Sequence, residues 1–202
     1  MTMIRRSALA LAATAVAAAV VTGCSTESGA PQPEPTTTAP RAQQWTPGTE
    51  SGARTAPPVP SSTPPEAANV AHGDASSVAE AAMTLWFTWD TTTDSGPIDG
   101  SVRATALLTP ELARSVSTEV PAQGPGGDWL GWKTQKARLV PTVTASSEPV
   151  PPQTSSRAYR SYVVDQAITL PDGSVTGHVQ SIVDVILVQG ANGWEVSRVN
   201  LR

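Results

Sequence analysis

Five titratable side chains lie on segments whose alternation of apolar and polar residues is typical of strands: Tyr159, Tyr162, Asp165, His178 and Asp184. General acid–base catalysis requires such groups to reach the same substrate atom. His178 and Asp184 share a strand face by parity, but six residues at roughly 3.4 Å each separate them by about 20 Å. We therefore predict exposed or structural roles for Asp165 and His178, and no catalytic residue.

Metal and nucleophile chemistry have no better support in the sequence. The chain has two histidines, His72 and His178, and a single cysteine, so a His-rich metal site is not expected. No serine lies in a G-x-S-x-G pattern, and no glycine-rich phosphate loop follows a predicted strand. The glycine cluster at 124–127 contains a proline and suits a loop. We expect no metal and no cofactor, and the protein is not predicted to be an enzyme.

The N-terminal segment has the order of a secretory signal. Arg5 and Arg6 precede an apolar run over Ala8–Val21, and Gly23 and Cys24 follow it. An uncleaved transmembrane anchor is the alternative, but the uncharged run of 17 residues is at the lower limit for crossing roughly 30 Å of hydrocarbon. Residues 1–23 are therefore predicted to be a signal peptide.

The residues Val21-Thr22-Gly23-Cys24 resemble the lipobox of bacterial lipoproteins. The resemblance implies that diacylglycerol, with palmitate or related acyl chains, is attached to the Cys24 thiol and that cleavage makes Cys24 the mature N-terminus. Two acyl chains suffice for stable anchoring, since each buried methylene contributes about 0.8 kcal/mol. The expected location is the extracytoplasmic side of the cell membrane. Because Cys24 is the only cysteine, no intrachain disulfide can form.

The mature chain is expected to be acidic. Removing residues 1–23 takes away two arginines and no acids, which changes the formal net charge from −4 to −6. No cluster of Lys and Arg forms a phosphate-binding stripe, so nucleic acid is not an expected partner.

Residues 24–73 are predicted to be a disordered tether. They are mostly Pro, Ser, Thr, Ala and Gly, a composition that cannot bury enough apolar surface to fold. Trp45 is the one large aromatic residue in this stretch, and we interpret it as incidental rather than as a recognition motif. The tether would carry the following domain, residues 74–202, away from the lipid.

A helix is predicted to begin near Asp74. Either Asp74 or Ser76 can cap its first turn, and Ser77 with Glu80 three residues later resembles a capping box. The apolar residues that follow recur at helical spacing and form one broad face, which should pack on a sheet. They are Val78, Ala82, Leu85, Trp86 and Trp89.

Two shorter helices are predicted before the strands. The run Thr91–Pro97 ends the first helix, because three threonines are followed by glycine and proline. A second helix is expected over Ile98–Leu108. The sequence Thr109-Pro110-Glu111 is typical of a cap, a first-position proline and an acidic first turn, which predicts a third helix over 111–118.

Beyond Asp128 the pattern predicts strands joined by tight turns. The turns Pro171–Ser174 and Gly190–Gly193 contain residues that tolerate positive φ, so the strands that they join should be antiparallel. The result is an α+β domain in which N-terminal helices pack on a curved, four-stranded antiparallel sheet. The predicted strands are Trp132–Thr144, Ala158–Leu170, Val175–Val188 and Trp194–Leu201.

This order of elements resembles the nuclear transport factor 2-like (cystatin-like) superfamily. The likeness rests on the Leu108–Leu112 turn and on tryptophans at the end of the first helix, at the start of the sheet and in the last strand. Within that superfamily, the chain most resembles the extracytoplasmic domains of conjugation and type IV secretion assembly proteins. The resemblance implies a half-open cone that acts through protein contacts. Those relatives usually carry a transmembrane helix, whereas this chain is predicted to carry a lipid.

The sequence thus leads to three functional hypotheses. The first is a lipid-anchored, noncatalytic interaction module of a cell-envelope assembly, conjugation- or secretion-related, with the membrane and envelope proteins as partners. The second is a small-molecule carrier or sensor that uses the cone as a pocket. The least favoured is an isomerase- or dehydratase-like enzyme, since the superfamily includes such enzymes. Most large aromatics should be core, with one or two at a pocket or interface, and the candidates are Trp86, Trp89, Trp129, Trp132, Tyr162 and Trp194.

Overall fold

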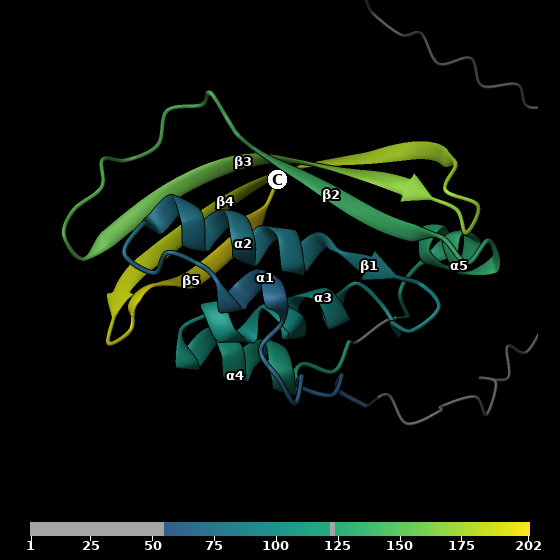
Figure 1. Ribbon diagram of the computed structural model, residues 1–202, viewed down its shortest axis with the longest axis horizontal. Helices are drawn as coiled ribbons and strands as arrows, with labels where there is room; N and C mark the ends of the chain where they lie inside the picture. Colours follow the sequence, from purple (N-terminus) through teal and green to yellow (C-terminus); the bar gives the residue numbers. More distant parts are fainter. Residues whose placement is uncertain (1–54, 122–123) are drawn as a thin grey trace, which may run out of the picture. The chain divides into compact units, whose positions relative to one another are not determined.

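The computed structural model describes residues 55–121 and 124–202. Cys24, Trp45 and the predicted signal peptide lie outside the described residues. The described part is an α+β fold in which helices cover the concave side of a curled antiparallel sheet (Figure 1).

The sheet has five strands in sequence order, each antiparallel to the next. Register shifts between Ile168 and Thr169 and between Ile186 and Leu187 interrupt the pairing. Bulges of this kind bend a strand and increase its twist, which accounts for the half-barrel shape. The strands are β1 (Trp89–Asp90), β2 (Arg138–Ala145), β3 (Arg157–Thr169), β4 (Val175–Gly190) and β5 (Gly193–Leu201).

The helices α1 to α4 lie on the concave side, with α2 running along the sheet, while α5 lies at one end beside the start of β2 (Figure 1). Among the described residues, no helix is both long enough and apolar enough to cross a membrane. The helices are α1 (Pro65–Ala68), α2 (Ala75–Phe87), α3 (Ile98–Arg103), the 3-10 helix η1 (Ala104–Leu107), α4 (Pro110–Thr118) and α5 (Gly127–Thr134).

Helix α2 begins as predicted but ends earlier. The Asp74 carboxylate caps it by accepting the backbone N–H groups of Ser76 and Ser77, each at 3.1 Å. Asp74, rather than a Ser77–Glu80 box, is therefore the cap. Thr88 is extended, and the predicted place of Trp89 on the helix is wrong: it lies in β1 and pairs with Leu139. The sheet consequently has five strands and not four.

The prediction that Trp132 opens the sheet is also wrong. Trp129 and Trp132 lie on α5, which starts after Gly126 at φ +92°. Lys136, at φ +54°, and a bond from the Ala137 N–H to the Trp132 carbonyl (3.0 Å) then end the helical segment. The apolar spacing of this short segment fits a helix or a strand equally well. The positive-φ residues at its two ends bound it as a helix.

The other elements match the prediction closely. The predicted second helix is observed as α3 followed by η1, and α4 is capped by the Thr109 hydroxyl, which accepts the Leu112 N–H at 3.3 Å. The last three strands are within two residues of their predicted bounds. Their turns contain Gly173 at φ +85° and Gly193 at φ +109°.

Part of the segment predicted as tether packs on the domain. Residues 65–68 form α1, and Ala67 is buried in the core. The His72 carbonyl accepts the Trp194 N–H at 2.8 Å, and a Cβ on Gly193 would lie 2.4 Å from that carbonyl. The folded part therefore includes residues before Gly73, because a few specific contacts outweigh the proline-rich composition.

The main core lies between α2 and the sheet. Val78, Ala82 and Met83 of α2 are fully buried against the inward-facing residues of β3, β4 and β5. Those sheet residues are Ala158, Tyr162, Val164, Val183, Val185, Leu187, Trp194 and Val196.

Candidate functional site

A cavity of about 720 Å³ opens where the C-terminal ends of α2 and α4 meet the start of α3 and the end of β5. The backbone N–H of Thr109 donates to the Val196 carbonyl at 2.8 Å, which fixes the start of α4 against β5. The described lining residues are Thr55, Trp86, Phe87, Trp89, Ser95, Gly96, Pro97, Ile98, Ser101, Val116, Glu119, Pro121, Gly124, Pro125 and Leu201.

Aromatic side chains from the end of α2 and from β1 form one wall of this pocket. Trp86 and Trp89 are half-buried, whereas Phe87 is buried. The Trp89 indole N–H donates to the Trp86 carbonyl at 2.9 Å, and the Phe87 and Trp89 rings lie 6.1 Å apart. The end of α2 and the start of β1 therefore hold the two indoles together at the cavity.

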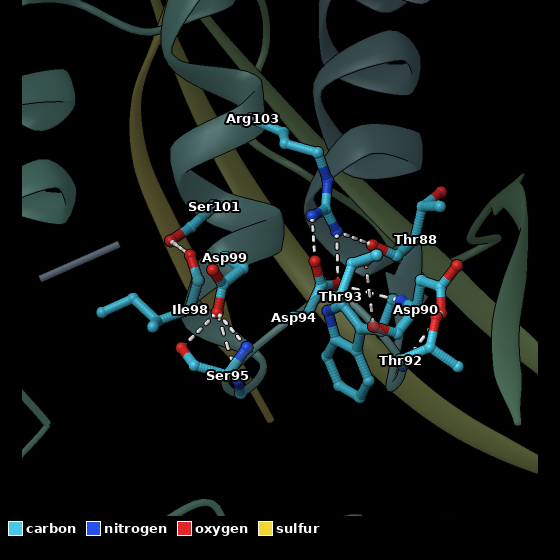
Figure 2. Close-up of polar contacts among 12 residues, drawn as sticks. Thr88, Asp90, Thr92, Thr93, Asp94, Ser95, Ile98, Asp99, Ser101 and Arg103 are labelled. Carbon is cyan, nitrogen blue, oxygen red and sulfur yellow. Dashed lines mark hydrogen bonds and ion pairs between the residues drawn. The ribbon is translucent and has the colours of Figure 1, made fainter. Parts of the chain in front are cut away.

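A polar cluster, formed by Asp90, Asp94, Asp99, Arg103 and Arg138, supports the loop that carries the opposite wall. Arg103 reaches from α3 to the Asp94 carboxylate at 2.6 and 3.0 Å and also donates to the Thr88 carbonyl (Figure 2). The Asp94 side chain is 6 % exposed and also accepts the Asp90 N–H at 2.9 Å. The ion pair ties the loop to α3, and the bond to the Thr88 carbonyl ties the end of α2 to α3.

Asp90 holds the near end of the loop. Its carboxylate accepts the backbone N–H of Thr92 (2.9 Å) and its hydroxyl (2.6 Å), and it pairs with Arg138 Nε at 2.8 Å. Burial raises the pKa of Asp90, but the Thr92 hydrogen bonds and the Arg138 charge outweigh this, so the pKa lies below its ordinary value. The carboxylate therefore stays ionised at neutral pH.

Asp99 holds the far end of the loop at the start of α3. Its carboxylate accepts the Ser95 N–H (3.1 Å), the Ser95 hydroxyl (2.7 Å) and the Gly96 N–H (3.1 Å) (Figure 2). The Ser101 hydroxyl donates to the Ile98 carbonyl at 2.7 Å. The polar groups of this wall are thus satisfied within the protein.

The lining suits binding better than catalysis. Glu119 is the one titratable side chain among the described residues of the lining, and it is exposed. General acid–base chemistry requires positioned groups with tuned pKa values, whereas apolar pockets with a few polar groups hold ligands. Across residues 55–121 and 124–202, no group of three or more His, Cys, Asp and Glu side chains could hold a metal ion.

The aromatic residues singled out from the sequence separate into three positions. Trp86 and Trp89 line the pocket. Trp129, which is buried, and Trp132, which is half-buried, lie behind Trp89 at 5.9 and 6.5 Å between ring centroids. Trp194 is buried in the core between the sheet and the helices, away from this lining.

Tyr162 is a core residue beneath the first turn of α2. Its hydroxyl donates to the Ser76 carbonyl at 3.5 Å. Burial raises the pKa of Tyr162 above its ordinary value, and the charges of Glu80 and Asp74 add to this shift, while Arg160 opposes it. The hydroxyl stays protonated and takes no part in the pocket.

Unlike Tyr162, the titratable residues Asp165, His178 and Asp184 lie on the outer face of the sheet. His178 Nδ1 is 2.9 Å from the Asp165 carboxylate, whereas Asp184 pairs with Arg202 Nε at 2.9 Å. The sequence analysis considered His178 with Asp184 and missed the His178–Asp165 pair. That pair depends on the register between β3 and β4, which the sequence does not give. Both side chains of that pair are solvent-exposed, and neither lines the aromatic cavity.

Several pocket residues were not singled out from the sequence. Phe87, Ile98, Val116 and Leu201 come from four different elements, and none has a motif. The only sequence signal for these residues is that they are apolar and lie near the ends of their elements. To predict them as pocket residues, one would have had to know how α3 and α4 pack.

Comparisons with protein-family models, with curated proteins and with solved structures return no match for this chain.

Proposed function

We propose that the domain is a noncatalytic binding module that holds a small apolar ligand, as a carrier or sensor. The observation that carries the proposal is the aromatic cavity of about 720 Å³, which lies within the roughly 300–1,000 Å³ of small-molecule sites. Paired charges on the loop and on α3, next to the lining, support this wall of the cavity.

The fold class supports assignment to the nuclear transport factor 2-like, or cystatin-like, cones. The helices precede strands β2–β5 of a curled antiparallel meander, α1–α4 lie in its concavity, and the pocket opens at one end of this helical layer (Figure 1). In this proposal, the pocket is the open end of the cone.

The proposed place of action is the outer side of the cell membrane. The lipobox-like residues that end at Cys24 support export and attachment of diacylglycerol to that cysteine. A lipid-anchored binding module would present its pocket to molecules in the cell envelope.

Native mass spectrometry of the full chain purified from its own cells tests the ligand. We expect a noncovalent small molecule on the wild-type protein and its loss in Ile98→Trp, which fills the pocket. Thr144→Trp, on an exposed position of β2, is the matched control and should keep the ligand. The proposal is contradicted if the wild-type protein holds no small molecule and gives no calorimetric signal with an apolar probe such as octanol.

A second candidate function is the interaction module of a cell-envelope assembly. The observation that favours it is the exposure of three large apolar side chains outside the pocket lining, Leu130 on α5, Val140 on β2 and Val175 on β4. Crosslinking in intact cells should capture a membrane-protein partner with Cys24 present and lose it in Cys24→Ala. The same pattern of crosslinks in Val140→Asp would show that Val140 is not part of the contact.

A further inference from the structure

Three side-chain hydrogen-bond donors of the pocket wall are already used inside the protein. The Trp89 indole N–H donates to the Trp86 carbonyl, and the Ser95 and Ser101 hydroxyls donate to Asp99 and to the Ile98 carbonyl. Both hydroxyl oxygens retain lone pairs that can accept. These three groups therefore favour a ligand that donates over one that only accepts, such as a carboxylate or phosphate.

The fixed charges around the cavity also disfavour anionic ligands and favour cationic ones. Glu119 is the C-cap of α4, and the described lining contains no Lys or Arg. The C-terminal ends of α2 and α4 both meet the pocket, and a helix C-terminus carries a partial negative charge that favours cations.

Near this wall, guanidinium groups and backbone N–H groups with partial positive charge are bound by carboxylates. The N–H groups of Ser95 and Gly96, before the start of α3, are bound by the Asp99 carboxylate. Arg103 is paired with Asp94, and Arg138 with Asp90. Four carboxylates, those of Asp90, Asp94, Asp99 and Glu119, thus accompany two guanidinium groups in and behind the wall.

We propose that the pocket selects amphiphilic cations: small molecules with an apolar body and one amine or quaternary ammonium group. This inference rests on the proposed ligand-binding function and names the class of ligand. The apolar body lies against Phe87, Ile98 and Val116. The cationic group lies near Glu119 and the indoles of Trp86 and Trp89, since aromatic rings attract cations through their quadrupole.

Calorimetric titration of the full chain with three probes of equal chain length tests this selectivity. The probes are octyltrimethylammonium, octanol and octanoate, at pH 7 and low salt. We expect the cation to bind at least about tenfold more tightly than the carboxylate, with the alcohol between them. Because exposed charges are screened by salt, the difference should narrow in 0.5 M NaCl.

A pair of variants on α4 separates the pocket charge from the general acidity of the chain. Glu119→Gln should weaken binding of the cation by several-fold and leave octanol unchanged. Glu111→Gln, in the first turn of the same helix and outside the lining, should change neither. Equal or tighter binding of octanoate would overturn the inference and leave the ligand-binding function standing. If none of the three probes binds, the binding function fails, and this inference fails with it.

Discussion

The two ends of the helical layer use the same kinds of side chain for opposite purposes. In the N-terminal half of α2, Val78 and Ala79 are fully buried in the core. At the other end, Trp86, Trp89 and Leu201 are apolar yet partly exposed around the cavity. Apolar character alone does not decide which end closes.

What differs is the polar structure behind each wall. At the closed end, buried apolar side chains fill the space between α2 and the sheet. At the open end, Asp94, Asp99 and Arg103 fix the loop and α3 in place, which keeps them from collapsing onto the aromatic rings. The difference teaches that a pocket in this fold is maintained by ion pairs and capping bonds.

Truncating the closed end should give the largest change in stability. Leu187 is fully buried, and Leu187→Ala should lower the free energy of unfolding by about 2–5 kcal/mol through lost burial and a residual cavity. Leu201→Ala at the open end removes the same atoms from a side chain that is 58 % exposed, and should cost less than about 0.5 kcal/mol. Urea denaturation of both variants measures the contrast. Similar losses would mean that the open end is core.

Crowding the contact between α2 and α3 should deform the pocket. A Cβ on Gly100 would lie 2.1 Å from the Trp86 carbonyl oxygen, so Gly100→Ala should destabilise by about 1–3 kcal/mol and displace Trp86. Gly131 is also helical, but a Cβ there meets nothing within 4 Å. Gly131→Ala should therefore stabilise the domain by roughly 0.5–1 kcal/mol. Thermal unfolding of the two variants should show shifts of opposite sign.

Breaking the ion pair behind the pocket should affect stability and binding together. Asp94→Asn leaves Arg103 without its partner and should cost about 1–3 kcal/mol, with weaker binding of any pocket ligand. The control is Asp184→Asn, which breaks the exposed pair with Arg202 and should cost at most about 1 kcal/mol. Denaturation and calorimetry on both variants decide whether the polar cluster maintains the cavity. Unchanged ligand affinity in Asp94→Asn would refute that role.

The smallest expected effect is a dependence of stability on acid pH. Because the folded-state pKa of Asp90 lies below its ordinary value of 3.8, its carboxylate stabilises the fold above that value, and this contribution is lost as the pH falls through the folded pKa. The stability difference between wild type and Asp90→Asn should therefore shrink as the pH falls from 7 to 3. Thr92→Val removes one of the bonds that lower this pKa and should show part of the same trend. A difference that stays constant with pH would contradict it.

The elements predicted correctly from the sequence are those with strong local signals. Asp74 caps α2, Thr109 and Pro110 begin α4, and Gly173 and Gly193 supply the positive φ of the hairpin turns. Each of these signals acts within a few residues. Local sequence therefore suffices for the start of α2, for α3, η1 and α4, and for the last three strands.

The errors fall where tertiary contacts decide. Trp89 continues the helical spacing of α2, but pairing with Leu139 draws it into the sheet. Trp129 and Trp132 fit a strand as well as a helix until the backbone at Gly126 and Lys136 is known. The pocket combines the ends of elements far apart in sequence, and no local pattern encodes their meeting.

The position of Trp89 has an optical consequence. Its ring lies 5.9 Å from that of Trp129 and 6.5 Å from that of Trp132, so the electronic transitions of the three indoles are coupled. Trp89 also lines the cavity. A molecule that enters the cavity perturbs a shared chromophore, so circular dichroism and fluorescence of the unlabelled protein can follow occupancy in real time.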